Sequence, residues 1–186
     1  MQRHARLEGL DAIWISHLHA DHAADLLTAY YALLYADLSP GGPIPLFGPP
    51  GIADRLAGFL TGDPARSPVE RTFAVEELRD GHRVRAGPLH LTSRTVSHGM
   101  PSFGVRIETV GTDRNESACL VYSGDTAPCT ALTDLADGCD TFLCEVGCPA
   151  VTDGEEQVHL TPEQAGTVAR PDRPRAGDRP PVPPEA

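Results

Sequence analysis

Residues 13–27, IWISHLHADHAADLL, place three histidines and an aspartate within six positions: His17, His19, Asp21 and His22. Apolar residues flank this cluster on both sides, and the pattern predicts a short buried strand, a loop and then a helix. Imidazole and carboxylate groups do not strengthen an apolar core, and crowding them costs desolvation and repulsion unless a cation lies among them. We therefore interpret the cluster as half of a metal site.

The spacing within the cluster supports this interpretation. His17 and His19 are two residues apart, so at the end of an extended strand both imidazoles can reach one point. Asp21 and His22 follow in the turn into the helix and can face a second point nearby. Mixed histidine and carboxylate ligation is typical of catalytic transition-metal sites. The alternative is a run of hydrogen-bonded histidines at a helix N-terminus, which the density of the motif disfavours.

Composition bounds the class of protein. The 186 residues suffice for one domain, and the 40% hydrophobic and 22% charged contents are those of a soluble globular protein. No apolar stretch is long enough for a membrane span and the N-terminus lacks a signal-peptide core, so we expect a cytoplasmic location. The net charge of -11 disfavours nucleic acid as a partner. Five cysteines without a CxxC pair predict buried reduced thiols rather than disulfides or a zinc ribbon.

The order of predicted elements indicates an α/β (α+β) fold. The helix after the cluster carries an apolar stripe at helical spacing, formed by Leu26, Leu27, Tyr30, Tyr31, Leu34 and Leu38. The later elements are predicted as a strand and turn at 44–51, a helix at 52–60, β segments at 88–99, 102–111 and 117–126, a helix at 129–138, a buried strand at 139–147 and a helix starting at Thr161. One domain is expected over 1–169, followed by a disordered, Pro- and Arg-rich tail over 170–186.

Several separated segments together resemble a known family. SHLHADH (16–22) resembles the signature of the metallo-β-lactamase superfamily, whose fold is an αββα sandwich with a metal site at one edge. His98 in TVSHGMPSFGVRIE, Asp125 in LVYSGDTAPC and the segment FLCEVG resemble the ribonuclease Z and phosphodiesterase branch. His159 in HLTPEQAG occupies the place of a histidine thought to donate a proton in that branch. The resemblance covers roughly residues 10–169.

The resemblance implies a role for each of these residues. His17, His19 and His98 would hold one cation, Asp21 and His22 would help to hold a second, and Asp125 would bridge the two; Asp21 and His159 are the expected catalytic residues. The expected cations are Zn²⁺, with Mn²⁺ as an alternative, and no other cofactor is expected. Two such cations lower the pKa of a shared water to about 7. His4, His82 and His90 are interpreted as surface or structural residues.

The chain also departs from the family pattern at both ends. Few residues precede the histidine cluster, so a layer of the sandwich is expected to be incomplete and to expose apolar edges. No histidine follows His159, so the second cation would lack one ligand and bind more weakly. From these departures we expect a chain truncated at both ends, or frameshifted, relative to an intact enzyme.

Hydrolysis of a phosphodiester by a metal-activated water is the leading functional hypothesis. Transfer RNA is disfavoured as the substrate because residues 148–158, CPAVTDGEEQV, form a short acidic interval where ribonuclease Z-like enzymes commonly carry an extended arm. A small phosphodiester, such as a cyclic nucleotide, suits the negative charge better. The alternatives are hydrolysis of another small ester, thioester or amide, and a metal-binding remnant without turnover. A homodimer is possible by analogy with related enzymes.

Overall fold

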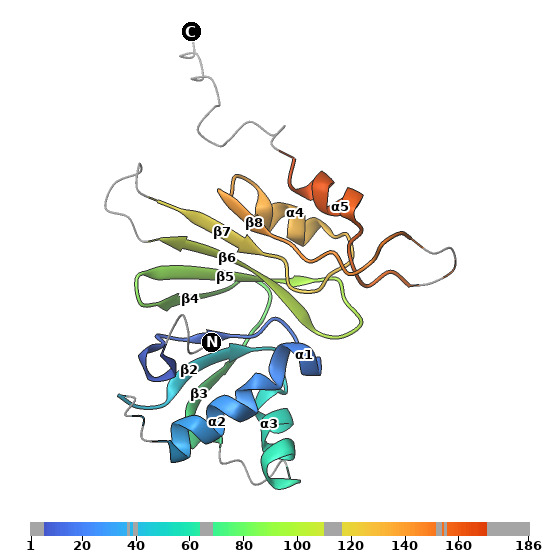
Figure 1. Cartoon of the computed structure of the whole chain (residues 1–186). Helices are drawn as coiled ribbons and strands as arrows, with labels where there is room; N and C mark the ends of the chain where they lie inside the picture. The colour runs from blue at the N-terminus through green and yellow to red at the C-terminus, as the bar shows by residue number, and fades with distance from the viewer. Residues whose placement is uncertain are drawn as a thin grey trace.

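The chain folds into two β-sheets that pack face to face between outer helices (Figure 1). The computed structural model describes residues 6–36, 38, 41–63, 69–109, 117–151, 154 and 156–170. This order of layers confirms the predicted αββα sandwich. Within the described ranges, no helix combines the length and the hydropathy that a membrane span requires.

The first sheet is parallel, and its strands come from the N-terminal half of the chain. The elements of this half are, in order, η1 (Leu7–Gly9), β1 (Ile13–Trp14), α1 (Ala20–Ala23), α2 (Asp25–Tyr35), β2 (Ile44–Gly48), α3 (Ile52–Thr61), η2 (Val69–Arg71) and β3 (Phe73–Glu77). The strand order is β1-β2-β3, and helices connect the strands because parallel neighbours require a crossover. Leu26 and Tyr30 of α2 and Leu56 of α3 form a buried cluster with Leu46 of β2.

The second sheet is mostly antiparallel, and its strands come from the C-terminal half of the chain. The elements of this half are, in order, β4 (His82–Ala86), β5 (Leu89–Val96), β6 (Ser102–Thr109), β7 (Cys119–Tyr122), α4 (Thr130–Ala136), β8 (Thr141–Leu143) and α5 (Pro162–Val168). The strands follow each other in chain order, and only the α4 crossover places a parallel strand, β8, beside β7. As predicted, α5 begins with Thr161 as N-cap, whose side chain accepts a hydrogen bond from the Gln164 N–H.

Contacts between the sheets fix where the histidine cluster lies. The Phe103 N–H at the start of β6 donates to the Ser16 carbonyl oxygen just after β1, at 3.0 Å. The Trp14 Nε1–H of β1 donates to Ser93 Oγ of β5 at 3.1 Å, and the Trp14 ring meets Tyr122 of β7 edge-on. The end of β1 therefore lies against the second sheet, close to where β5 ends and β6 begins.

Burial differs from the sequence prediction at three elements. β8 was predicted to be buried, but Thr141 and Leu143 are exposed because β8 is the last strand in the order of its sheet. β1 has only two residues, and both are half-buried. In α2, Tyr31 is 51% exposed although it was assigned to the apolar stripe, whereas Leu33 is buried.

Sequence patterns indicated a β-rich middle but did not single out β3 and β4. In the tail predicted as disordered, residues 171–186 lie outside the described residues, so the domain boundary after residue 169 stays a prediction.

Candidate metal centre

His17 and His19 lie in the loop between β1 and α1. The chain stays extended after β1, since the Ile15 N–H donates to the Phe47 carbonyl oxygen at 2.8 Å. His17 is fully buried, and its Nδ1 lies 3.0 Å from Ser16 Oγ. Its Nε2 lies 3.1 Å from Nδ1 of His19, which is exposed. The structure therefore brings these two imidazoles together.

His98 reaches the same point from the second sheet. It follows β5 almost directly, and its Nδ1 lies 2.9 Å from the Val158 carbonyl oxygen. A carbonyl oxygen can only accept, so Nδ1–H donates and Nε2 keeps its lone pair. This Nε2 lies 3.3 Å from Nδ1 of His19. The hydrogen bond from Nδ1 thus selects the tautomer that presents a ligand nitrogen to the other imidazoles.

Asp125 enters from the loop between β7 and α4. The preceding Gly124 has a φ of +60°, and a Cβ at that position would lie 2.4 Å from the Phe103 carbonyl oxygen, so a glycine is required there. Ser102 Oγ donates to the Asp125 carbonyl oxygen at 2.9 Å and holds the loop. Asp125 Oδ2 lies 3.6 Å from His17 Nε2.

These four residues, His17, His19, His98 and Asp125, form the first cluster. Their ligand atoms all lie within 4.8 Å of one another. Zinc–nitrogen bonds of about 2.0–2.1 Å in a tetrahedral site place neighbouring ligand nitrogens about 3.3 Å apart. The two imidazole N···N distances here are 3.1 and 3.3 Å. Burial, followed by the proximity of His22, lowers the pKa of His17 to about 4, so the imidazole is neutral, the form that binds a metal. The donor set fits a divalent cation.

Asp21, His22 and Asp125 form the second cluster. His22 Nε2 lies 3.4 Å from Oδ2 of Asp21 and 3.4 Å from Oδ2 of Asp125. Asp125 thus faces both clusters through one carboxylate. The Asp21 side chain is 80% exposed, so this cluster is open to solvent on one side. Because it offers three donor residues, the second cluster should hold a cation less tightly than the first.

Glu145 is a residue of this site that sequence reasoning missed. Its side chain is 11% exposed and lies just after β8. Its Oε1 accepts hydrogen bonds from the backbone N–H groups of Thr126 at 3.1 Å and Leu160 at 3.0 Å, and Oε2 accepts from the Gly147 N–H. FLCEVG was recognised as a family-like segment, but a single glutamate after an apolar strand carries no signal of its own.

His159 lies between Glu145 and the first cluster. Its Nδ1 is 3.2 Å from Glu145 Oε1 and 3.9 Å from Asp125 Oδ2. Its ring centroid lies 5.1 Å from that of His98. A Cβ on Gly147 would lie 2.8 Å from the His159 ring, so the ring packs closely on that backbone. The predicted proton donor is therefore beside the cluster, with Glu145 as its hydrogen-bond partner.

His82, His90 and the five cysteines lie outside the two clusters. His82 is buried and bonded through Nε2 to Glu76 at 2.8 Å, which fits a structural role, and His90 is exposed. His4 lies outside the described residues. All five cysteines are free thiols, as predicted, although only Cys119 is buried. Burial raises the pKa of Cys144 to about 11.

An apolar pocket of about 360 Å³ opens beside the first cluster. Its polar lining residues are His19, just before α1, and Arg55 of α3. The other lining residues are apolar and come from the first cluster's loop and the helices α1 to α3: Leu18, Ala20, Ala23, Ala24, Leu27, Leu56 and Phe59. This pocket can accept an apolar or aromatic group next to the ligand histidines.

Comparison with known proteins identifies relatives of the whole described domain. The family model of the beta-lactamase superfamily domain matches residues 1–176. The uncharacterised protein ML1173 of Mycobacterium leprae is 36% identical over 172 residues, which cover 91% of this chain and 58% of that protein. Ribonuclease Z of Mycobacterium bovis is 33% identical over 156 residues, which cover 73% of this chain and 51% of that enzyme. The chain thus spans between half and three fifths of the length of these relatives.

Two solved structures share the fold. The metallo-beta-lactamase fold protein YhfI from Bacillus subtilis aligns with a TM-score of 0.71 and 22% identity, covering 91% of this chain and 63% of that one. Human tRNase Z, short form, aligns with a TM-score of 0.62 and 18% identity, covering 88% and 69%. With the family match, the layered sandwich and the predicted histidine motif all in agreement, the chain belongs to the metallo-β-lactamase superfamily of metal-dependent hydrolases.

Proposed function

We propose that this chain forms the catalytic domain of a metal-dependent phosphodiesterase. Membership of the superfamily supports hydrolysis, and the similarity to ribonuclease Z supports a phosphodiester as the bond cleaved. The observation that carries the proposal is the convergence of four ligand residues, from three separate segments of the chain, within 4.8 Å. A cytoplasmic location and a homodimer remain part of the proposal.

Zn²⁺ is the proposed cation, with Mn²⁺ as the alternative. Imidazole nitrogen and carboxylate oxygen are ligands that both ions accept, and the N···N distances of the first cluster suit zinc. The first cluster would hold one ion and the second cluster another, with Asp125 shared between them. When bound, the ions supply Lewis acidity and a water of lowered pKa.

His159 is the proposed proton donor to the leaving oxygen. Hydrogen bonding of its Nδ1 to Glu145 Oε1, at 3.2 Å, turns Nε2 away from the carboxylate and leaves it free to carry the transferred proton. Glu145 is itself held by backbone N–H groups, so it fixes the orientation of the imidazole. We infer that Glu145 is a positioning residue that acts through His159.

Asp21 is proposed to accept a proton at the solvent-exposed side of the second cluster. Its carboxylate is 80% exposed and lies 3.4 Å from His22. A carboxylate in this place can take up a proton and pass it to bulk solvent, while His22 keeps it beside the second cluster. Exchange of Asp21 for asparagine should therefore slow turnover more than it weakens the first cluster's affinity for metal.

A small phosphodiester with an apolar or aromatic group is the proposed substrate. The pocket beside His19 is about 360 Å³ in volume and its lining is mostly apolar, while Arg55 at its wall can pair with a phosphate oxygen. The net charge of -11 opposes a long polyanion such as transfer RNA, the substrate class that the name tRNase Z implies for the human relative. A cyclic nucleotide satisfies both conditions.

Two alternatives use the same clusters. Another ester or thioester would be hydrolysed by the same chemistry, and the alternative of a metal-binding domain without turnover is favoured by the openness of the second cluster. We favour the phosphodiester over both alternatives because Arg55, beside the pocket, can pair with a phosphate oxygen.

Turnover of bis(p-nitrophenyl) phosphate by the purified chain, supplied with Zn²⁺ or Mn²⁺, tests the proposal. We expect His98→Ala to abolish release of p-nitrophenol, and His159→Gln to slow it by about 10²–10⁴-fold. His90→Ala is the matched control, since His90 is exposed and lies outside both clusters. Faster hydrolysis of a p-nitrophenyl thioester analogue than of the phosphodiester would select the ester alternative. Absence of any turnover with the metal bound would select the inactive one.

A further inference from the structure

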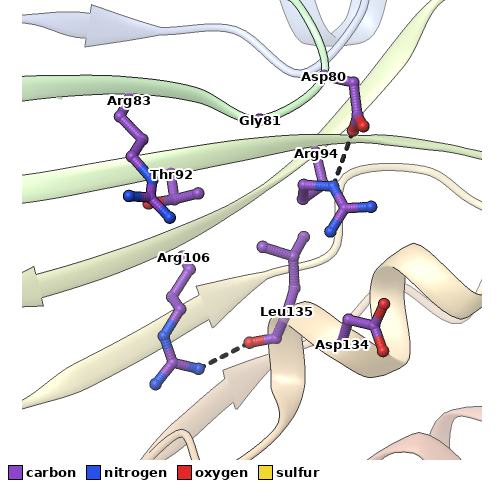
Figure 2. Close-up of a pocket in the computed structure, with 8 residues that line it drawn as sticks. All are labelled: Asp80, Gly81, Arg83, Thr92, Arg94, Arg106, Asp134 and Leu135. Atoms are coloured by element: carbon purple, nitrogen blue, oxygen red, sulfur yellow. Dashed lines mark hydrogen bonds and ion pairs between the residues drawn. The ribbon is translucent and has the colours of Figure 1, made fainter.

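The outer face of the second sheet carries an arginine-rich cleft that the proposed function does not use. Arg83 of β4, Arg94 of β5 and Arg106 of β6 come from three adjacent strands (Figure 2). Arg83 pairs with Thr92, and Thr92 pairs with Arg106, so these residues form one row across the sheet. Arg94 lies two residues from Thr92 and shares its face, because side chains alternate along a strand.

Helix α4 forms the opposite wall of the cleft. It packs against β5 and β6, and it contributes Asp134 and Leu135 to the lining, while Asp80 and Gly81 close one end (Figure 2). The volume of about 370 Å³ lies in the range of sites for small molecules. The cleft is therefore large enough for a small polar ligand.

Two of the three guanidinium groups are held in place by the protein. Arg106 Nη1 donates to the carbonyl oxygens of Leu135 at 2.8 Å and Asp137 at 2.9 Å, at the end of α4, and its Nε donates to Glu108 Oε1 at 3.1 Å. Arg94 Nε donates to Asp80 Oδ1 at 2.8 Å. The terminal nitrogens of Arg94 have no partner within the described part of the chain, so they remain available as donors. Groups held in this way lose little side-chain entropy when a ligand binds.

Arg83 supplies the third group. Among the described residues, no hydrogen bond or ion pair engages its side chain. The cleft lining holds three guanidinium groups and the carboxylates of Asp80 and Asp134, and Arg106 is also paired with Glu108 at 3.1 Å, so the charges of these six groups balance. The guanidinium donors without a partner among the described residues, those of Arg83 and the terminal nitrogens of Arg94, are the groups that can bind a small anion.

We propose that this cleft binds the phosphate group of a small phosphomonoester. Guanidinium forks match phosphate oxygens, and donors from three strands suit a tetrahedral dianion better than a planar carboxylate. Asp134, whose carboxylate has no hydrogen-bond or ion-pair partner among the described residues, can accept a hydrogen bond from a hydroxyl or amino group of the same ligand. The site does not depend on the metal clusters or on the proposed activity.

Calorimetric titration of the chelator-treated, full-length chain with inorganic phosphate and glycerol phosphate tests this proposal. Removal of metal prevents phosphate from binding at the metal clusters, and the variants of Arg83 and Arg94 distinguish the cleft from Arg55 beside the apolar pocket. We expect saturable binding that weakens about tenfold in Arg83→Gln and in Arg94→Gln, because each loses a charge-assisted hydrogen bond. Arg83→Glu, at the same exposed position, should abolish binding without altering the far-UV circular dichroism.

Arg85→Gln is the matched control. Arg85 lies on the same strand and face as Arg83, is also exposed, and does not line the cleft. Its affinity for phosphate should stay within about twofold of the unmodified chain if the cleft is specific. No saturable binding, an equal loss in Arg85→Gln, or equal affinity for glycerate and glycerol phosphate would each overturn the proposal.

Discussion

Replacement of Glu145 by glutamine perturbs the hydrogen-bond network behind the metal centre while preserving side-chain volume. Glu145 Oε1 accepts from the N–H groups of Thr126 and Leu160 and from His159, and Oε2 accepts from the Gly147 N–H. An amide nitrogen cannot accept a hydrogen bond. Whichever way the glutamine amide is oriented, at least one of these donors therefore faces another donor.

The expected cost follows from burial and from the number of donors. The Glu145 side chain is 11% exposed, so solvent replaces little of what is lost. A hydrogen bond to a charged group contributes about 1.5–3 kcal/mol, and a buried donor left without a partner costs about 1–3 kcal/mol. We expect Glu145→Gln to lower the free energy of unfolding by about 2–4 kcal/mol. The loosened His159 should slow turnover by about 10–100-fold.

Two measurements separate the structural part of this effect from the functional part. Denaturant unfolding of the metal-free chain gives the change in stability, with Glu156→Gln as an exposed control expected to stay within about 0.5 kcal/mol. Turnover of Glu145→Gln, His159→Gln and the double variant gives the coupling. Since Glu145 acts through His159, the double variant should be no slower than His159→Gln alone. Multiplication of the two single effects, or a stability loss below about 0.5 kcal/mol, would refute the positioning role.

Three further changes test other parts of the site. Burial lowers the pKa of His17 from 6.5 to about 4, so between these pH values the unfolded chain binds a proton that the folded chain does not. In the metal-free chain, the free energy of unfolding should therefore fall by about 3 kcal/mol as the pH falls from about 6.5 to about 4. A free energy of unfolding that stays constant over this window would contradict the prediction. Gly124→Ala should lower the free energy of unfolding by at least about 2 kcal/mol, because Gly124 has a φ of +60° and a Cβ there would lie 2.4 Å from the Phe103 carbonyl oxygen. Gly166→Ala is the control: its position in α5 has open space around it, so urea unfolding should show no loss of stability. Ala23→Phe should fill the pocket beside His19 and raise the KM for bis(p-nitrophenyl) phosphate about tenfold. The KM for methyl p-nitrophenyl phosphate, in which a methyl group replaces one aromatic ring, should rise less. Equal increases in KM for both substrates would reject the pocket as the place where the aromatic group binds.

The local part of the site was predictable, because spacing alone determines it. Two histidines two residues apart on an extended segment point to one side, and the structure places His17 Nε2 and His19 Nδ1 3.1 Å apart. The approach of His98 and Asp125 depends on strand pairing in the second sheet, which no local pattern contains. The resemblance to a family indicates those two residues, and the tertiary structure brings their ligand atoms within 4.8 Å of those of His17 and His19.

Other features depend on tertiary packing and had no sequence signal. Two of the backbone N–H groups that hold Glu145, those of Thr126 and Leu160, lie 19 and 15 residues away, so the sequence around Glu145 does not indicate them as partners. The burial of Leu33 rather than Tyr31 on α2 depends on which face of the helix meets β2. The exposure of β8 depends on its place at the end of the strand order rather than on its apolar composition.

The metal centre should also connect the two sheets energetically. His17 and His19 follow the last residues of β1, whereas His98 and Asp125 come from the second sheet, so the first cluster joins groups from both layers. A ligand that binds only the folded chain at a hundred times its Kd stabilises that state by about 2.7 kcal/mol. We therefore expect chelation to lower the melting temperature of the chain, and we expect His98→Ala to remove most of that difference. His90→Ala should keep it, because His90 is exposed and outside the cluster. An equal response to chelator in all three proteins would mean that the imidazoles of the two sheets do not share a cation.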